Sequence, residues 1–100
     1  MKSQKASNKE HARKIDVGFT ELGWEDFQHW RESDPKIFEK LNVLIDACIA
    51  GPFKGIGKPE PLKGNLSGLW SRRIDREHRL VYRMEAGIVY VVQCRFHYND

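Results

Sequence analysis

Glycine and proline residues recur at short intervals between Phe53 and Gly68, near the middle of a chain of 100 residues. Neither residue suits the interior of a helix or of a central strand, so this stretch is predicted to be a loop. Sixteen residues is long for a connection in a compact domain, which makes the stretch a candidate functional loop. Its glycine and proline residues are Gly55, Gly57, Pro59, Pro61, Gly64 and Gly68.

A short strand and a helix are predicted well before this loop. Ile15, Val17 and Phe19 alternate with Asp16 and Gly18, a pattern typical of a strand. Thr20 is then a candidate N-cap for a helix. The large aromatic residues of that helix recur every three positions, at Trp24, Phe27 and Trp30. Such a stripe favours a core position or a dimer contact.

A second helix is predicted to begin at Asp34-Pro35, with the aspartate as N-cap and the proline as the first helical residue. Gly51-Pro52 ends it. Its apolar residues follow at helical spacing, at Ile37, Phe38, Leu41, Leu44, Ile45 and Cys48. The two helices are therefore expected to form a hairpin.

Three strands are predicted after the loop, at residues 69–74, 78–84 and 88–97, with connections short enough for hairpins. The resulting order β-α-α-β-β-β indicates an α+β domain, in which a helix hairpin packs on one face of a small antiparallel sheet. We expect this domain to span residues 15–100. Residues 1–14 are polar, basic and without periodicity, which predicts a flexible N-terminal extension.

Alternation assigns side chains to the two faces of the sheet. In the last strand Ile88, Tyr90, Val92, Cys94 and Phe96 are expected to face the helices, so that the intervening residues face away. Arg79, Arg95 and His97 are then expected to project together from the open face.

Hairpin counting places Arg73 opposite Arg79 on this face, and like charges in that arrangement repel each other. A phosphate site is one reason to keep such a pair, and the alternative is that both arginines extend into water. Glu60 lies between Pro59 and Pro61, so its carboxylate sits on a stiff segment. A carboxylate, several arginines and a late histidine are the groups that RNA cleavage needs when no metal or other cofactor takes part.

Composition narrows the partners and the compartment. The formal net charge of +3 favours an anionic partner such as nucleic acid or an acidic protein. The two cysteines, Cys48 and Cys94, lack the paired spacing of a zinc site and are expected to be buried thiols in a reducing cytosol. No apolar run approaches the ~20 residues of a membrane helix, and the N-terminus lacks the apolar core of a signal peptide. These features predict a cytoplasmic protein with no membrane partner.

The chain also resembles the YoeB/Txe toxins of the RelE superfamily from about Ile15 to Tyr98. Several long motifs occur in the family's order, which makes the resemblance specific. The matching segments are Pro52-Phe53, Gly55, Gly57-Lys58-Pro59-Glu60-Pro61-Leu62-Lys63, Asn65-Leu66-Ser67-Gly68, Trp70-Ser71-Arg72-Arg73-Ile74, Glu77-His78-Arg79-Leu80-Val81-Tyr82, Cys94-Arg95 and His97-Tyr98.

This resemblance implies the microbial-ribonuclease-like fold of the RelE and YoeB toxins, and membership of a type II toxin–antitoxin module. Toxins of this kind enter the A site of the ribosome and cut mRNA there without a metal, which inhibits translation. The expected products are a 2′,3′-cyclic phosphate and a 5′-hydroxyl. The expected partners are the ribosome, mRNA, an acidic antitoxin of the YefM/Axe kind and a second copy of the chain.

The resemblance also implies roles for individual residues. Glu60 corresponds to the general base, Arg79 to the group that stabilises the transition state, His97 to the general acid and Tyr98 to an aid in orienting the substrate. The candidate RNA-binding residues are Lys63, Arg72, Arg73 and Arg95.

Two other function classes remain open at the level of sequence. One is a superfamily toxin that inhibits DNA gyrase without cutting RNA, which a supercoiling assay would identify. The other is a catalytically silent module that only binds an antitoxin. Glu60 with His97-Tyr98 favours the nuclease.

Overall fold

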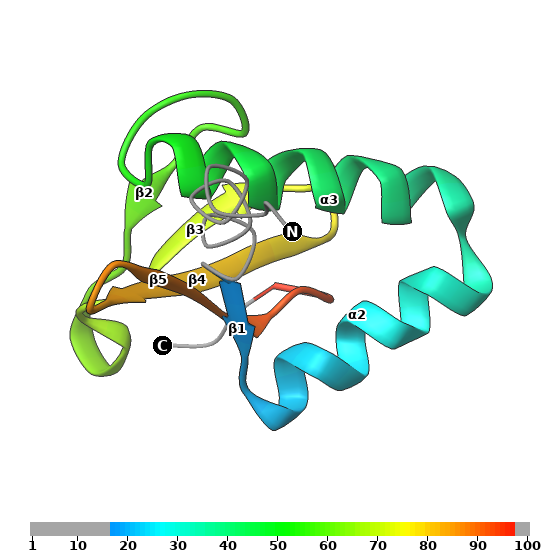
Figure 1. Ribbon diagram of the computed structural model, residues 1–100, viewed down its shortest axis with the longest axis horizontal. Coiled ribbons are helices and arrows are strands. Elements are labelled where there is room, and N and C mark those ends of the chain that lie inside the picture. Colours follow the sequence, from blue (N-terminus) through cyan, green and yellow to red (C-terminus); the bar gives the residue numbers. More distant parts are fainter. Residues whose placement is uncertain (1–16, 98–100) are drawn as a thin grey trace, which may run out of the picture.

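The computed structural model of the protein describes residues 17–97 (Figure 1). The predicted extension of residues 1–14, Ile15 of the first predicted strand and Tyr98 lie outside the described residues. The elements follow in the order β1 (Val17–Phe19), α2 (Glu21–Ser33), α3 (Pro35–Ala50), β2 (Glu60–Pro61), a 3-10 turn (Gly64–Leu66), β3 (Trp70–Arg73), β4 (Arg79–Glu85) and β5 (Ile88–Gln93). None of the helices in this part of the chain has the length and apolar character needed to cross a membrane.

The strands form one five-stranded sheet in the order β1-β5-β4-β3-β2. The predicted α+β class and helix hairpin are confirmed, and α3 lies along one side of the sheet (Figure 1). The sheet is mixed rather than wholly antiparallel, because β1 pairs in parallel with β5 while the other neighbours are antiparallel. A parallel pair requires a long connection, and both helices and three strands intervene between β1 and β5.

The predicted caps of both helices are present. Thr20 Oγ1 accepts the backbone N–H of Gly23 at 3.0 Å and donates to the carbonyl of Val92 at 2.8 Å, so this cap also ties α2 to β5. Gly23 allows that contact, because a Cβ there would collide with the carbonyl oxygen of Val91. The carboxylate of Asp34 accepts the first N–H groups of α3.

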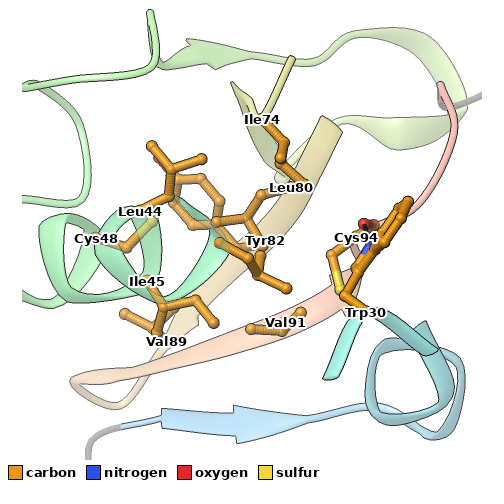
Figure 2. Packing of buried hydrophobic residues seen from close by; sticks show 11 residues of the cluster. Trp30, Leu44, Ile45, Cys48, Ile74, Leu80, Tyr82, Val89, Val91 and Cys94 are labelled. Carbon is orange, nitrogen blue, oxygen red and sulfur yellow. Dashed lines mark hydrogen bonds between the residues drawn. The ribbon is translucent and has the colours of Figure 1, made fainter. Parts of the chain in front are cut away.

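The core lies between α3, α2 near Trp30 and the covered face of the sheet (Figure 2). It includes Trp30, which is 5% exposed and whose indole N–H donates to the carbonyl of Cys94 at 2.8 Å. Of the two positions that the aromatic stripe favours, Trp30 therefore takes the one in the core, because it is covered within its own chain. Trp24 stays 46% exposed beside Leu22, which is 50% exposed.

A bulge in β5 changes which side chains face the helices. Tyr82 pairs with Val91 whereas Val81 pairs with Gln93, so Val92 is an extra residue on β5. Val89 and Val91 lie in the core at 1% and 0% exposure, contrary to the face predicted from simple alternation. The extra residue reverses the alternation, so Cys94 returns to the core as predicted.

Both cysteines are free and buried, as predicted. Burial raises the pKa of the Cys48 thiol to about 11, although the charge of Arg72 partly opposes the shift. Burial, assisted by the negative charge of Asp26, raises the pKa of the Cys94 thiol further. Both groups are therefore thiols rather than thiolates at neutral pH.

We expect neither thiol to react with an aromatic disulfide reagent at pH 8 on the timescale of minutes, because the thiolate is the reactive form and both sulfurs are covered. In guanidinium chloride two equivalents should react at once, one for each cysteine. The absorbance of the released thiol measures both. Rapid labelling of the native protein would mean that one of these core positions opens readily.

Candidate active site

The open face of the sheet brings together residues from three neighbouring strands, β2, β3 and β4. Glu60 of β2 pairs with Ser71 of β3. Arg73 of β3 pairs with Arg79 of β4, as hairpin counting predicted. Because side chains on one face recur every second residue, Arg73 shares the face of Ser71 and is a diagonal neighbour of Glu60. A carboxylate and two arginines therefore occupy adjacent positions on one face.

Glu60 sits on a short edge strand rather than in a structureless loop. The carbonyl of Gly57 accepts the backbone N–H of Arg73 at 2.7 Å, and the N–H of Leu62 donates to the carbonyl of Leu69 at 2.9 Å. These contacts bracket Glu60, whose side chain is exposed. Proline suits an edge strand because its missing N–H faces no partner.

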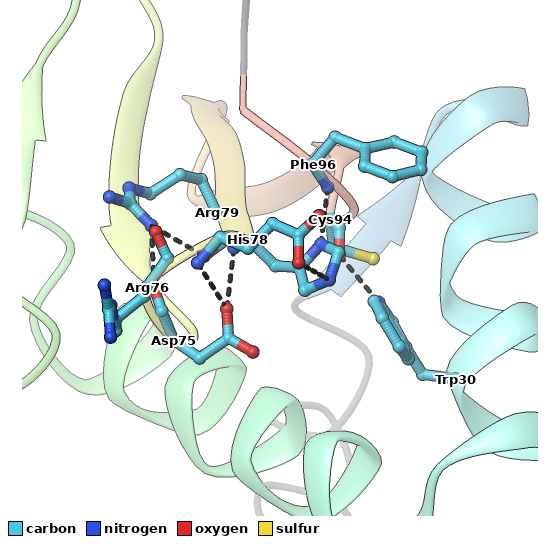
Figure 3. Close-up of polar contacts among 8 residues, drawn as sticks. Trp30, Asp75, Arg76, His78, Arg79, Cys94 and Phe96 are labelled. Carbon is cyan, nitrogen blue, oxygen red and sulfur yellow. Dashed lines mark hydrogen bonds and ion pairs between the residues drawn. The ribbon is translucent and has the colours of Figure 1, made fainter.

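Arg79 is more enclosed than predicted, with only 9% of its surface exposed. Its Nη1 donates to the carbonyls of Asp75 at 2.7 Å, His78 at 3.0 Å and Arg76 at 3.4 Å (Figure 3). The expectation that Arg79 extends freely into solvent is thus wrong, because the turn before β4 holds its guanidinium group. Among the described residues, Nε and Nη2 of Arg79 make no hydrogen bond. Nη2 points away from the turn (Figure 3).

Asp75 shapes the turn that holds Arg79. Its Oδ1 accepts the backbone N–H groups of Glu77 at 2.8 Å and His78 at 2.7 Å. Burial of the carboxyl opposes ionisation, but these two hydrogen bonds and the nearby cations outweigh it and lower the pKa of Asp75. The ionised carboxylate therefore closes the turn whose carbonyls point at Arg79.

The segment that follows β5 is fixed at four points (Figure 3). The Asp26 carboxylate accepts the N–H of Cys94 at 3.0 Å, and Trp30 donates to the carbonyl of the same residue. His78 Nδ1 accepts the N–H of Phe96 at 2.7 Å, and the backbone N–H of Arg79 donates to the carbonyl of Phe96 at 3.1 Å. This segment leads directly into His97, and the residue before it, Phe96, is hydrogen-bonded to the backbone of Arg79.

The remaining predicted site residues lie in different surroundings. Arg95 is partly exposed and its guanidinium stacks on the Phe96 ring at 4.6 Å. His97 is exposed, and its carbonyl lies 3.5 Å from the side-chain nitrogen of Gln93. Lys63 is exposed in the turn between β2 and β3. Tyr98 lies outside the described residues.

Arg72 is not available to bind RNA, which contradicts its prediction. It is fully buried, on the face opposite Arg73. Its guanidinium donates to the carbonyls of Gly51 at 2.6 Å, Lys54 at 3.0 Å and Ile56 at 2.8 Å, and to the Tyr82 hydroxyl at 3.1 Å. Arg72 therefore organises the loop from the inside.

His78 and Asp26 are the residues that sequence reasoning missed. Alternation from Leu80 and Tyr82 places His78 on the covered side of β4, and the four-residue interval to Trp30 places Asp26 on the buried side of α2. Polar residues at such positions signal a specific partner, since buried polar groups are normally hydrogen-bonded. Within residues 17–97 no group of three or more histidine, cysteine or acidic side chains is placed to hold a metal ion.

Comparison with known proteins identifies the family. The model of the YoeB-like toxin of bacterial type II toxin–antitoxin systems matches residues 19–98. The chain belongs to this toxin family. It is 56% identical over 82 residues to the toxin YoeB of Streptomyces coelicolor, covering 82% of this chain and 98% of that protein.

Two solved structures of Staphylococcus aureus proteins share the fold. One is a heterotetrameric complex of the YoeB–YefM toxin–antitoxin, with a TM-score of 0.78 and 38% identity, and the other is a YoeB dimer, with a TM-score of 0.77 and 38% identity. Each match covers 84% of this chain and 98% of the other.

We expect Arg72→Met to lower the free energy of unfolding by about 2–4 kcal/mol, because it leaves three loop carbonyls and the Tyr82 hydroxyl without their donor. Arg73→Met is the matched control, since it removes the same charge from the exposed face of the same strand. That variant should stay within about 0.5 kcal/mol of the wild type. Urea unfolding measures both, and equal midpoints would contradict the role of Arg72.

Replacing His78 tests the hydrogen bond by which it fixes the segment that follows β5. In His78→Leu the Phe96 amide loses its acceptor, so its hydrogen exchange should accelerate about fivefold to tenfold, as expected for one net hydrogen bond. His78→Asn offers an amide oxygen near the position of Nδ1 and should preserve most of the protection. The amide of Tyr82 serves as an internal control in NMR. Equal protection of Phe96 in all three proteins would exclude this contact.

Proposed function

We propose that this toxin is a ribosome-dependent endoribonuclease that cuts mRNA in the A site, with general acid–base catalysis by its own side chains. The observation that carries the proposal is the convergence of Glu60, Arg73 and Arg79 on one face, with the segment leading to His97 fixed beside Arg79. RNA supplies its own nucleophile, the 2′-hydroxyl. The enzyme then needs a base, an acid and a cation.

In the proposed mechanism Glu60 accepts the proton of the 2′-hydroxyl as the oxygen attacks the adjacent phosphate. Arg79 offsets the negative charge that grows on the phosphoryl oxygens, and His97 gives a proton to the departing 5′-oxygen. The P–O bond to the 5′-oxygen breaks as the new P–O bond forms, leaving a 2′,3′-cyclic phosphate and a 5′-hydroxyl. Tyr98 helps to orient the substrate, and Arg73, Arg95 and Lys63 bind RNA.

The held guanidinium of Arg79 suits this role. A cation whose orientation is fixed before the reaction stabilises a developing charge without reorganisation at the moment of reaction. The turn carbonyls occupy Nη1, and Nε and Nη2 are the atoms that we assign to the phosphate. The ribosome would supply the remaining condition, since free RNA rarely holds its 2′-hydroxyl in line with the leaving oxygen.

The partners follow from the family and from the surface. We propose an acidic YefM/Axe-like antitoxin whose C-terminal segment covers the basic face, in line with the YoeB–YefM complex among the related structures. We also propose a homodimer, supported by the related YoeB dimer and by the exposed Leu22 and Trp24. We place the toxin in the cytoplasm, where translating ribosomes are found.

Glu60→Gln tests the base, because it keeps the shape of the side chain but cannot accept the proton. Cleavage should slow by about 10²-fold or more while ribosome binding persists. Primer extension on mRNA in a purified translation mixture measures the cuts. Glu32→Gln, an equal change of charge at an exposed position of α2, should cleave at the wild-type rate.

A message with one 2′-deoxy nucleotide on the 5′ side of the cut tests the nucleophile. That bond should resist the wild-type toxin while neighbouring sites are still cut. Normal cleavage at the deoxy position would remove both the 2′-hydroxyl and Glu60 from the mechanism. Absence of any cut in the wild type, together with inhibited supercoiling, would instead support a gyrase inhibitor.

A further inference from the structure

A small cationic pocket lies at the rim of the sheet, where the end of β3 meets α3. It has a volume of about 310 Å³ and lies between α3, the loop before β2, the end of β3 and the turn before β4. Its charged lining residues are Lys40, Lys58, Arg73, Arg76 and Asp75. Of its four cations only Arg73 has a role in the proposed active site, so the other three are unassigned.

The pocket carries an excess of positive charge. Lys40, Lys58, Arg73 and Arg76 are all exposed, and within residues 17–97 none of them takes part in an ion pair. Asp75 is the one acidic group in the lining, and its Oδ1 is occupied by two backbone N–H groups of the turn. Four cations from separate segments repel one another across this space, and a bound anion would relieve that repulsion.

The backbone of the pocket is fixed rather than adaptable. Lys58 has a φ of +52°, a left-handed conformation that is unfavourable for a residue with a Cβ. Gly57, just before it, has a φ of +85° and packs so closely that a Cβ would lie 2.8 Å from the Leu44 side chain. The hydrogen bond from Arg73 N–H to the Gly57 carbonyl locks the same turn. The fold therefore holds Lys58 at this rim despite an unfavourable backbone.

The location connects the pocket to the proposed active site. Arg73 contributes to both, and Arg76 belongs to the turn that binds Arg79. Figure 3 shows the guanidinium groups of Arg76 and Arg79 on the same side of that turn. An RNA backbone that passes Arg79 and Arg73 would reach Arg76, Lys58 and Lys40 next.

We propose that this pocket is a second phosphodiester site, which holds an RNA phosphate next to the cleavage site. The proposal rests on the proposed nuclease function. Arginine matches phosphate in a bidentate geometry and lysine adds point charge, so two of each suit a phosphodiester. The volume fits a phosphate group with its ribose rather than a folded element of a protein partner. The phosphate comes from the message or from ribosomal RNA, which share this chemistry.

The test compares two double variants with the same loss of charge. Lys40→Gln with Arg76→Gln removes two cations from the pocket, and Arg31→Gln with Lys36→Gln removes two exposed cations of α2 and α3 that do not line it. The probe is a short single-stranded RNA with a 2′-O-methyl group on each ribose, which cannot be cut. Its affinity is measured over a series of salt concentrations.

The pocket variant should bind the RNA about tenfold more weakly, and the slope of log K against log salt should fall by about 0.7 for one lost phosphate contact. The control variant should keep the wild-type slope. Equal loss in both double variants would mean that only overall charge matters, and it would overturn the proposal. Lys40→Glu reverses the charge of one exposed pocket residue and repeats the test. Urea unfolding checks that each variant is folded.

Two further arms identify the source of the anion. Weaker binding of the pocket variant to ribosomes without message, with RNA binding unchanged, supports a ribosomal RNA phosphate. If the pocket variant binds a poly-glutamate peptide more weakly but keeps its affinity for RNA and for ribosomes, the proposal is overturned in favour of an acidic protein partner. All of these measurements are independent of cleavage. If the wild type binds RNA through the pocket but makes no cut in the translation mixture, the nuclease function fails and the phosphodiester site stands.

Discussion

The hydrogen bonds of the buried Arg72 guanidinium are the interactions on which the placement of the open face depends. Four hydrogen bonds join it to the loop after α3 and to Tyr82 of β4, and the Tyr82 hydroxyl in turn donates to the carbonyl of Pro52 at 2.6 Å. Burial raises the pKa of Tyr82 to about 12, so this hydroxyl keeps its proton and remains a donor. No carboxylate pairs with Arg72 among the described residues. The charge is compensated by carbonyl dipoles, which a planar group with five donors can collect from several directions.

This arrangement lets one short strand serve both the fold and the site. Successive residues of β3 point to opposite faces, so Arg72 draws the loop onto the core while Arg73 stands on the open face. The loop then enters β2 in a fixed position, with Glu60 opposite Ser71. The charge of a buried arginine is costly to desolvate, and the hydrogen bonds to the loop are what offset that cost. The Tyr82 hydroxyl at Pro52 and the Arg73 N–H at Gly57 hold the same loop, and Arg72 adds three further hydrogen bonds to its carbonyls.

The sequence was sufficient for features that local chemistry determines. The caps at Thr20 and Asp34 and the pairing of Arg73 with Arg79 depend on nearby residues and on short connections. It was insufficient where the outcome depends on a distant partner. Arg72 and Arg73 are the same residue type on the same strand, and only the loop packed over one of them makes it structural. The extra residue at Val92 likewise leaves no mark in the alternation of apolar residues, because both faces of β5 are apolar there.

The C-terminal segment shows how a site on an open face can still be preorganised. After β5 the chain leaves the sheet, and Phe96 adopts a φ of +63°, which is unfavourable by roughly 1–2 kcal/mol for a residue other than glycine. The backbone accepts this conformation because Asp26, Trp30, His78 and Arg79 all bind Cys94 or Phe96. Two of these partners lie on α2 and two at the start of β4, so the helix hairpin and the sheet must both be in place before the segment is fixed. The path of the backbone into His97 is thus a property of the whole fold, because the residue before it, Phe96, is hydrogen-bonded to His78 and to the backbone of Arg79.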